Sequence, residues 1–247
     1  MVLALLAIPA WHLVWHDEFE KPGLPDPSRW GYDLGYIANN EAQWYVGPRK
    51  ENARIENGHL VIEARKDNFD GHPITSARLT TATTATWTYG KIEVRAKVPG
   101  GRGTWPAIWT LGSNINKAGW PMCGEIDIME HVGFDPERVH FNVHTKAYNH
   151  VLKTNKGTNL TVPKVTEGFH TYAIEWDAEM ITWLMDDKKV FSFANEHKTE
   201  AEWPFSKPQF VILNLAIGGD WGGQQGIDSA IFPSRFLIDY VRVYQRK

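Results

Sequence analysis

The chain has 247 residues, 43% of them hydrophobic, which is enough for one sizeable core, and all-β folds of this length commonly form one domain. Its 26 basic and 29 acidic residues give a net charge of −3 without a long run of like charges, which excludes a typical nucleic-acid footprint and favours an uncharged partner. The single cysteine, Cys123, excludes an intrachain disulfide and a cysteine-based zinc site. We therefore expect one domain over 1–247 that acts as a monomer.

The first ten residues, MVLALLAIPA, are apolar and resemble the centre of a secretory signal, but no Lys or Arg precedes them. The run is too short to span a bilayer, and no other stretch approaches that length, so we expect no membrane partner. Residues 1–10 are either an ordered N-terminal arm or the remnant of a signal. We expect a secreted, extracellular protein.

Two-residue periodicity dominates the rest of the chain. In KIEVRAKV, apolar residues alternate strictly with charged ones, which predicts a sheet with one buried and one wet face. The segment QFVILNLAIGG is almost continuously apolar, as in a strand covered on both faces. Similar short strands are predicted at 59–65, 91–98, 170–176, 180–186, 189–193, 209–219 and 238–244. No helical stripe or repeat interrupts them, so we predict an all-β fold, an antiparallel β-sandwich or jelly roll.

The chain has twelve tryptophans, and several lie beside Gly, Asn, Pro or acidic residues rather than inside apolar runs. A sugar ring stacks its C–H face on an aromatic ring, while its hydroxyl groups need nearby polar side chains. This mixture is typical of a concave cleft that binds a glycan. The tryptophans concerned are Trp44, Trp105, Trp109, Trp120 and Trp221.

The segment CGEIDIMEHVG, residues 123–133, otherwise looks like a buried strand, yet it carries Glu125, Asp127 and Glu130. Side chains alternate between the two faces of a strand, so Glu130 would point away from Glu125 and Asp127. One extra residue between Asp127 and Glu130 corrects this. We therefore predict a β-bulge at 128–129, a feature common beside active sites, which turns all three acids into one groove.

The spacing of these acids predicts a reaction. The Cα atoms of Glu125 and Glu130 would lie roughly 13 Å apart. Inward-leaning side chains then approach the ~5–5.5 Å carboxyl gap of a retaining glycosidase and fall short of the ~6.5–9.5 Å of an inverting one. Asp127 between them would raise the pKa of its less well hydrogen-bonded neighbour, so that one carboxyl stays protonated and another ionised. The alternatives are acids that face solvent or bind a cation.

These residues resemble glycoside hydrolase family 16, and within it the laminarinase-like endo-β-1,3-glucanases. The similarity extends from LVWHDEF to IDYVRVYQ and includes YGKIEVRAKVPGGRGTWPAIWTLG and GWPMCGEIDIMEHVG. The bulged Glu-x-Asp-x-x-Glu form resembles laminarinases, agarases and carrageenases, whereas the mixed-linkage lichenases lack the extra residue. One departure is HFNVHT, in which Phe141 and Asn142 stand where relatives often have smaller residues, and this leaves the depth of the cleft open.

The resemblance implies roles for individual residues. Glu125 would be the nucleophile, Glu130 the general acid/base, and Asp127 a helper that bonds to Glu125. No cofactor would take part in the chemistry, although relatives often bind one structural Ca²⁺. The implied substrate-binding residues are Asn40, Arg78, Trp105, Trp109, Trp120, His144 and Trp221, and the implied calcium ligands are Glu18, Gly58 and Asp239.

We expect the protein to hydrolyse a polysaccharide, β-1,3-glucan, within the chain and with retention. Two alternatives remain open. One is a mixed-linkage or agarase-like activity on the same scaffold. The other is a non-catalytic glucan-binding domain, which would not need two acids in its groove.

Overall fold

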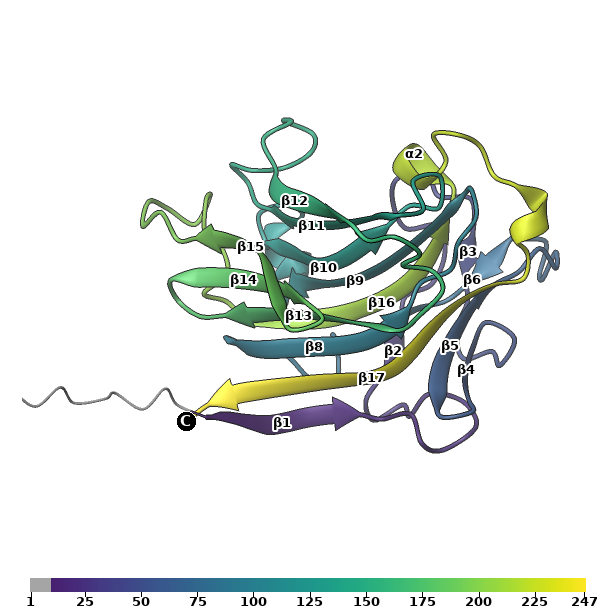
Figure 1. The fold of residues 1–247 in the computed structure, drawn as a ribbon, viewed down its shortest axis with the longest axis horizontal. Coiled ribbons are helices and arrows are strands. Elements are labelled where there is room, and N and C mark those ends of the chain that lie inside the picture. The colour runs from purple at the N-terminus through teal and green to yellow at the C-terminus, as the bar shows by residue number, and fades with distance from the viewer. Residues whose placement is uncertain (1–9) are drawn as a thin grey trace, which may run out of the picture.

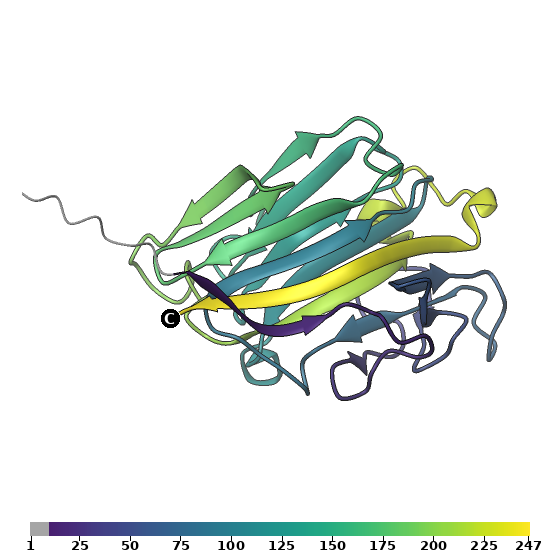
Figure 2. The same ribbon diagram turned by 60° about the horizontal axis from the view of Figure 1, so that its bottom comes forward.

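The computed structural model describes residues 10–247, so the predicted arm over 1–10 lies outside the described residues except for Ala10. Two antiparallel sheets pack face to face (Figures 1 and 2), which confirms the predicted all-β sandwich. Helix is limited to α1 (Ile115–Ala118), α2 (Gly219–Gly222) and a 3-10 turn at Ser229–Ile231 in the described part of the chain. Within it, no helix is long and apolar enough to cross a membrane.

The outer sheet has eight strands, and its longest member, β17, pairs with β8, β5 and β1. Its order is β15 (Lys188–Ala194), β14 (Met180–Met185), β13 (His170–Trp176), β8 (Gly90–Lys97), β17 (Ser234–Arg246), β5 (His59–Ala64) and β4 (Ala53–Glu56), with β1 (Trp11–Asp17) beside β17.

The second sheet, called here the cleft sheet, has seven strands, and its strands β12, β11, β10, β9 and β16 lie above β8, β17 and β1 of the outer sheet in Figure 1. Its order is β12 (Lys156–Thr161), β11 (Arg138–His144), β10 (Glu125–His131), β9 (Thr104–Gly112), β16 (Gln209–Ile217), β7 (Arg78–Thr80) and β2 (Gly31–Tyr32). A small parallel pair, β3 (Trp44–Tyr45) and β6 (Thr75–Ser76), lies beside the two main sheets.

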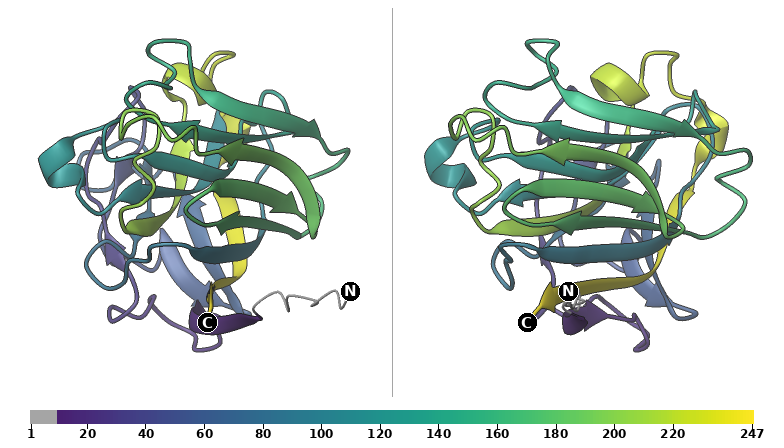
Figure 3. Two further views of the ribbon diagram at one scale, coloured as in Figure 1. Left: turned by 90° about the vertical axis from the view of Figure 1, so that its left-hand side faces the viewer. Right: turned by 60° about the vertical axis from the view of Figure 1, so that its left-hand side comes forward.

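The hydrophobic core fills the space between the sheets, and Figure 3 shows the two layers from the side. In β8, Ile92, Val94 and Ala96 are buried, as the alternation predicted. All nine residues of β16 are buried, which confirms a strand covered on both faces. The larger core side chains include Trp30, Trp183, Phe141 and Phe236.

The catalytic strand candidate, β10, contains the predicted bulge. Against β11, Asp127 pairs with Asn142 and Glu130 with His140, so three steps on β10 match two on β11. Against β9, the shift falls between Asp127 and Met129, which leaves Ile128 as the extra residue. Ile128 and Met129 both point into the core. A bulge therefore re-aims the strand so that Glu130 stays on the face it would otherwise lose.

The bulge is also bonded from the opposite sheet. The indole Nε1 of Trp183, on β14, donates to the backbone carbonyl of Asp127 at 2.8 Å. Bulges interrupt the ladder of backbone hydrogen bonds, and a buried carbonyl without a donor is costly. Trp183 thus satisfies a carbonyl of the bulged strand while packing in the core.

Candidate active site

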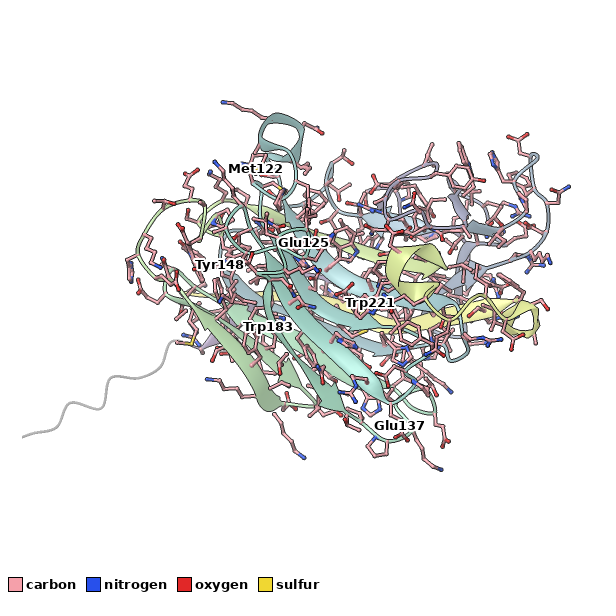
Figure 4. All side chains as sticks on the ribbon, turned by 90° about the horizontal axis from the view of Figure 1, so that it is seen from above. Met122, Glu125, Glu137, Tyr148, Trp183 and Trp221 are labelled. Carbon is pink, nitrogen blue, oxygen red and sulfur yellow. The ribbon has the colours of Figure 1, made fainter. Side chains whose placement is uncertain are left out.

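A cleft of about 940 Å³ runs over the exposed face of the cleft sheet. Figure 4 looks down onto this face and labels Glu125 and Trp221. Its lining comes from β7, β9, β10, β11, β12 and β16, and from the 37–41 loop, α2 and the segment before β12. The lining includes Glu125, Asp127 and Glu130 together with Arg78, Trp105, Trp109, Trp120, His144 and Trp221.

Each of the two glutamates receives an indole hydrogen bond. Trp120 Nε1, from the loop before β10, donates to Glu125 Oε2 at 2.8 Å. Trp105 Nε1, from β9, donates to Glu130 Oε1 at 3.1 Å. Hydrogen bonds to a carboxylate favour its ionised form and hold it in one orientation. The structure therefore anchors each carboxyl on a separate aromatic residue.

Asp127 lies between the glutamates and is only 2% exposed. His144 Nε2 lies 3.3 Å from Asp127 Oδ2 and 3.8 Å from Glu125 Oε1. One potential ligand atom from each of Glu125, Asp127 and His144 falls within 4.8 Å of the others, a grouping that could hold a cation. We interpret it instead as a set of groups that share protons, because the Trp120 indole already holds Glu125 in place in the cleft.

Burial raises the pKa of all three acids. The pKa of Glu125 rises to about 8, with the charge of Asp127 acting in the same direction. The pKa of Glu130 rises to about 7 through burial, against the opposing effect of His144. The pKa of Asp127 lies well above its ordinary value because of burial and then the charge of Glu130. Burial and mutual repulsion therefore both disfavour three negative charges in this site.

The distribution of these protons follows from the coupling between the acids. Once Asp127 is protonated, its charge no longer opposes ionisation of Glu125, and its O–H can donate to the Glu125 carboxylate. Trp120 and His144 favour the ionised form of Glu125 as well. The two hydrogen bonds to Glu130, at 3.1 and 3.4 Å, are both longer than the 2.8 Å bond from Trp120 to Glu125, and Glu130 is then the glutamate that can carry a proton.

The predicted tryptophans of the cleft pack against, or hydrogen-bond to, neighbouring side chains. Trp221 packs edge-on against Trp105, with ring centroids 5.4 Å apart, and against His140 at 4.8 Å. Trp109 donates to Asn214 at 2.7 Å, and Arg78 lies over its ring at 4.7 Å. These contacts fix the orientation of aromatic rings that line the cleft. Trp44 lies elsewhere, stacked on His72 at 3.9 Å.

Two predicted polar residues are placed differently from their expected roles. Arg78 lines the cleft, but its Nε donates to Asp33 at 2.8 Å. The side chain of Asn40 donates to Asp220 at 2.9 Å. Because Asp220 precedes Trp221 in α2, Asn40 braces that helix from the rim, and its neighbour Asn39 is the residue that lines the cleft.

Sequence reasoning missed several lining residues, although one pattern could have revealed some of them. Along β11, His140, Asn142 and His144 share the cleft face, while Phe141 is fully buried in the core. The sequence left the depth of the cleft open at this point, and Phe141 does not line the cleft, because alternation turns it inward. Burial lowers the pKa of His140 to about 4, so this imidazole is neutral. Other missed residues include Ile37, Glu41, Ile115, His150, Asn155, Asn159, Asn214 and Gln224.

The predicted calcium ligands lie on the outer sheet and its connections. Both oxygens of Glu18 accept from Arg242, at 2.9 and 2.8 Å. Asp239 accepts from Arg95 at 2.5 Å and lies 3.7 Å from His59, which follows Gly58. Carboxylate and backbone oxygens suit Ca²⁺ in kind. A cation there would take the place of guanidinium partners that these carboxylates have in the structure.

Comparisons with known proteins agree with this geometry. The family model described as Glycosyl hydrolases family 16 matches residues 40–242. A beta-glucanase of Rhodothermus marinus is 52% identical over 246 residues, covering 96% of this chain and 86% of that protein.

Solved structures give the same result. The X-ray structure of the laminarinase from Rhodothermus marinus matches with a TM-score of 0.94 and 51% identity, covering 97% of this chain and 99% of that chain. A mutant of a non-specific endo-beta-1,3(4)-glucanase, co-crystallized with 1,3-beta-D-cellotriosyl-glucose, matches with a TM-score of 0.93 and 48% identity, covering 97% of each chain.

Proposed function

This chain belongs to glycosyl hydrolases family 16, and from that premise we propose that it cleaves internal bonds of β-1,3-glucan with retention at the anomeric carbon. The observation that carries the proposal is the bulged strand β10, which presents Glu125 and Glu130 in one cleft with an indole donor on each. Relatives named laminarinase and endo-1,3(4)-glucanase support the substrate class.

The reaction proceeds as a double displacement. Glu130 gives its proton to the glycosidic oxygen while the Glu125 carboxylate attacks the anomeric carbon, so the carbon–oxygen bond to the leaving sugar breaks and a glycosyl-enzyme ester forms. Glu130, now ionised, takes a proton from water. The resulting hydroxide equivalent attacks the same carbon and releases Glu125. Protonated Asp127 stabilises the Glu125 carboxylate before attack and after release.

The substrate suggests where the protein works. A glucan polymer from the surroundings does not cross a membrane, so an enzyme that cleaves its internal bonds would act on it outside the cell. We therefore infer secretion, in accord with the apolar start of the sequence, MVLALLAIPA. Detection of activity in the culture supernatant of the producing organism, with none retained in washed cells, is the expected result.

Mixed-linkage glucan is a second candidate substrate. It is favoured by the likeness to the non-specific endo-beta-1,3(4)-glucanase. A purely glucan-binding role is disfavoured, because a binder gains nothing from desolvating three acids. An agarase-like activity has no feature of the cleft in its favour.

Substrate and stereochemistry can be tested together. We expect the highest kcat/KM on laminarin, lower rates on lichenan, and no hydrolysis of agarose or cellulose. Proton NMR of early products should show the β-anomer first, as a double displacement requires. Glu125→Gln and Glu130→Gln should each lose most of the activity and remain folded. Early release of the α-anomer, or equal rates on agarose and laminarin, would contradict the proposal.

We also infer a structural Ca²⁺ held by Glu18, the Gly58 carbonyl and Asp239, distant from the reaction. Asp17 pairs with Val241, so Glu18 lies beside the part of β17 that carries Asp239. Added CaCl₂ should raise the melting temperature by mass action and leave kcat at low temperature unchanged. The same stabilisation in Glu18→Gln would show that calcium binds elsewhere.

A further inference from the structure

Asn142 occupies the place in the cleft where the bulge opens. It pairs with Asp127, whereas the next cleft-facing residue of β11, His140, pairs with Glu130. The Asn142 side chain therefore reaches across the bulge, and its Nδ2 donates to Glu130 Oε2 at 3.4 Å. Trp105 donates to the other oxygen, Oε1, at 3.1 Å. Glu130 thus has a separate donor on each oxygen, and Asn142 provides the longer bond.

The amide of Asn142 is held in one direction. Its Oδ1 accepts a hydrogen bond from Asn155 Nδ2 at 3.1 Å, so its Nδ2 is turned toward Glu130. The reverse orientation would point the Asn142 oxygen at a carboxylate and remove the acceptor that Asn155 Nδ2 has on Asn142. Asn155, in the segment before β12, therefore selects the orientation that donates to Glu130.

Gly157 provides the space for this arrangement. It pairs directly with Asn142, and a Cβ at this position would lie 2.1 Å from Asn142 Oδ1 and 2.4 Å from the Phe141 carbonyl. Such distances are clashes, so any larger residue would displace the Asn142 side chain, the strand, or both. The glycine in β12 is explained by close approach, because its position in a regular strand otherwise favours a side chain.

We propose that Asn142 is a positioning residue for Glu130, with Asn155 and Gly157 fixing the direction in which its amide points. This inference rests on the proposed role of Glu130 as acid/base. Glu130 must be protonated in the first displacement and ionised in the second, so its proton affinity has to suit both steps. An N–H donor stabilises the ionised form and opposes the effect of burial.

Other charged groups also act on Glu130. From its own strand, Glu125 and Asp127 oppose its ionisation, and from β11 His144 favours it. His140 is neutral above pH of about 4 and contributes little charge. The remaining titratable or charged residues that line the cleft are Glu41, Arg78, His150 and Asp220. The experiment below changes none of them.

The alkaline limb of the pH profile of kcat/KM on laminarin reports the proton on the general acid. Loss of the donor in Asn142→Ala should move this limb to higher pH by about 0.5 pH units or more, the effect of one hydrogen bond to a charged group. Asn142→Asp should move it further, because it adds a like charge. Asn155→Ala should move it in the same direction, and the double variant no further than Asn142→Ala.

Asn159→Ala is the matched control. Asn159 also lines the cleft from β12, but its Oδ1 accepts from Arg138 at 2.9 Å and does not join the chain that ends at Glu130. The alkaline limb should stay in place in this variant. A ¹³C NMR titration of the Glu130 carboxyl in labelled protein should show the same displacement in Asn142→Ala as the kinetics.

The outcomes separate the inference from its premise. If the limb stays within about 0.2 pH units of the wild type in folded Asn142→Ala and in Asn155→Ala, the inference is wrong, even where Glu130→Gln is inactive. If Asn142→Ala moves the alkaline limb and Asn155→Ala does not, the positioning role of Asn142 is supported and the proposed role of Asn155 in orienting its amide is wrong. If Glu130→Gln keeps wild-type activity, the proposed function itself fails.

Discussion

At the scale of single residues, the two glutamates of the site differ in their hydrogen-bond donors. Glu125 is bonded to Trp120 and lies beside His144, whereas Glu130 is bonded to Trp105. Both tryptophans also present ring surface to the cleft. One indole can therefore contribute to catalysis through its N–H and to sugar binding through its ring, and the two contributions can be measured apart.

Trp120→Phe keeps a ring and removes the N–H, whereas Trp120→Ala removes both. We expect Trp120→Phe to lower kcat on laminarin with little change in KM, because the Glu125 carboxylate loses a donor. Trp120→Ala should lose a further ~1–3 kcal/mol in kcat/KM through the missing aromatic contact. Steady-state kinetics of the two variants test both expectations. Equal kcat/KM values for Trp120→Ala and Trp120→Phe would contradict a role of the ring in sugar binding.

The acids also affect stability. The pKa of each of the three acids rises in the folded protein, that of Glu125 from 4.5 to about 8, so the folded site binds protons more tightly than the unfolded chain between these values. Stability therefore falls as the pH rises from about 4.5 to about 8 and is unaffected by this group below that window.

Glu125→Gln removes this penalty. It should stabilise the protein by about 2 kcal/mol at pH 8, allowing for protons shared among three acids, and by almost nothing at pH 4. Thermal or denaturant unfolding at the two pH values gives the measurement. An exposed control, Glu167→Gln, should show no such pH dependence, and equal stabilisation at both pH values would refute the explanation.

At the scale of elements, β10 shows what a sequence can and cannot predict. The bulge follows from parity alone, because three acids at positions 125, 127 and 130 share a face only with an extra residue. The strand order and the pairing of Asn142 with Gly157 could not be read in this way, since they depend on which distant strands become neighbours. The same holds for Asn40, which braces α2 through Asp220.

Deletion of Ile128, the extra residue, tests the bulge. Glu130 pairs with Ala107 two steps after Asp127 pairs with Trp109, so a strand without the extra residue would keep this glutamate opposite Ala107 and on the cleft face. The deletion removes one fully buried side chain and should cost about 2–5 kcal/mol of stability. It should nevertheless retain more activity than Glu130→Gln, measured below the melting temperature of both. An inactive but folded deletion variant would show that parity is not sufficient.

At the scale of the whole molecule, the outer sheet supports the reaction although none of its strands lines the cleft. The link is Trp183, which lies in the core and donates to the Asp127 carbonyl. A second core tryptophan, Trp176 of β13, donates to the Phe205 carbonyl at 3.0 Å, outside the catalytic strand. The two indoles make similar hydrogen bonds, but only the bond from Trp183 reaches the strand that carries the acids.

Trp183→Phe should reduce stability by about 1–2 kcal/mol through the unpaired carbonyl and should also lower kcat, because the bulge loses its donor. Trp176→Phe should have a similar effect on stability and leave kcat unchanged. Melting temperatures and initial rates at a temperature where both variants are folded provide the comparison. Equal kcat values in the two variants would show that the bulge keeps its shape without Trp183.

The bond from Trp183 has a practical consequence for the enzyme under heat. In many enzymes the active site loosens at temperatures where the scaffold is still intact, so activity is lost before the protein melts. Here β10, which carries the acids, is hydrogen-bonded through the core to Trp183 of the outer sheet, and the two sheets can separate only when this bond breaks. On heating, enzymatic activity and tertiary structure should therefore be lost over the same temperature range.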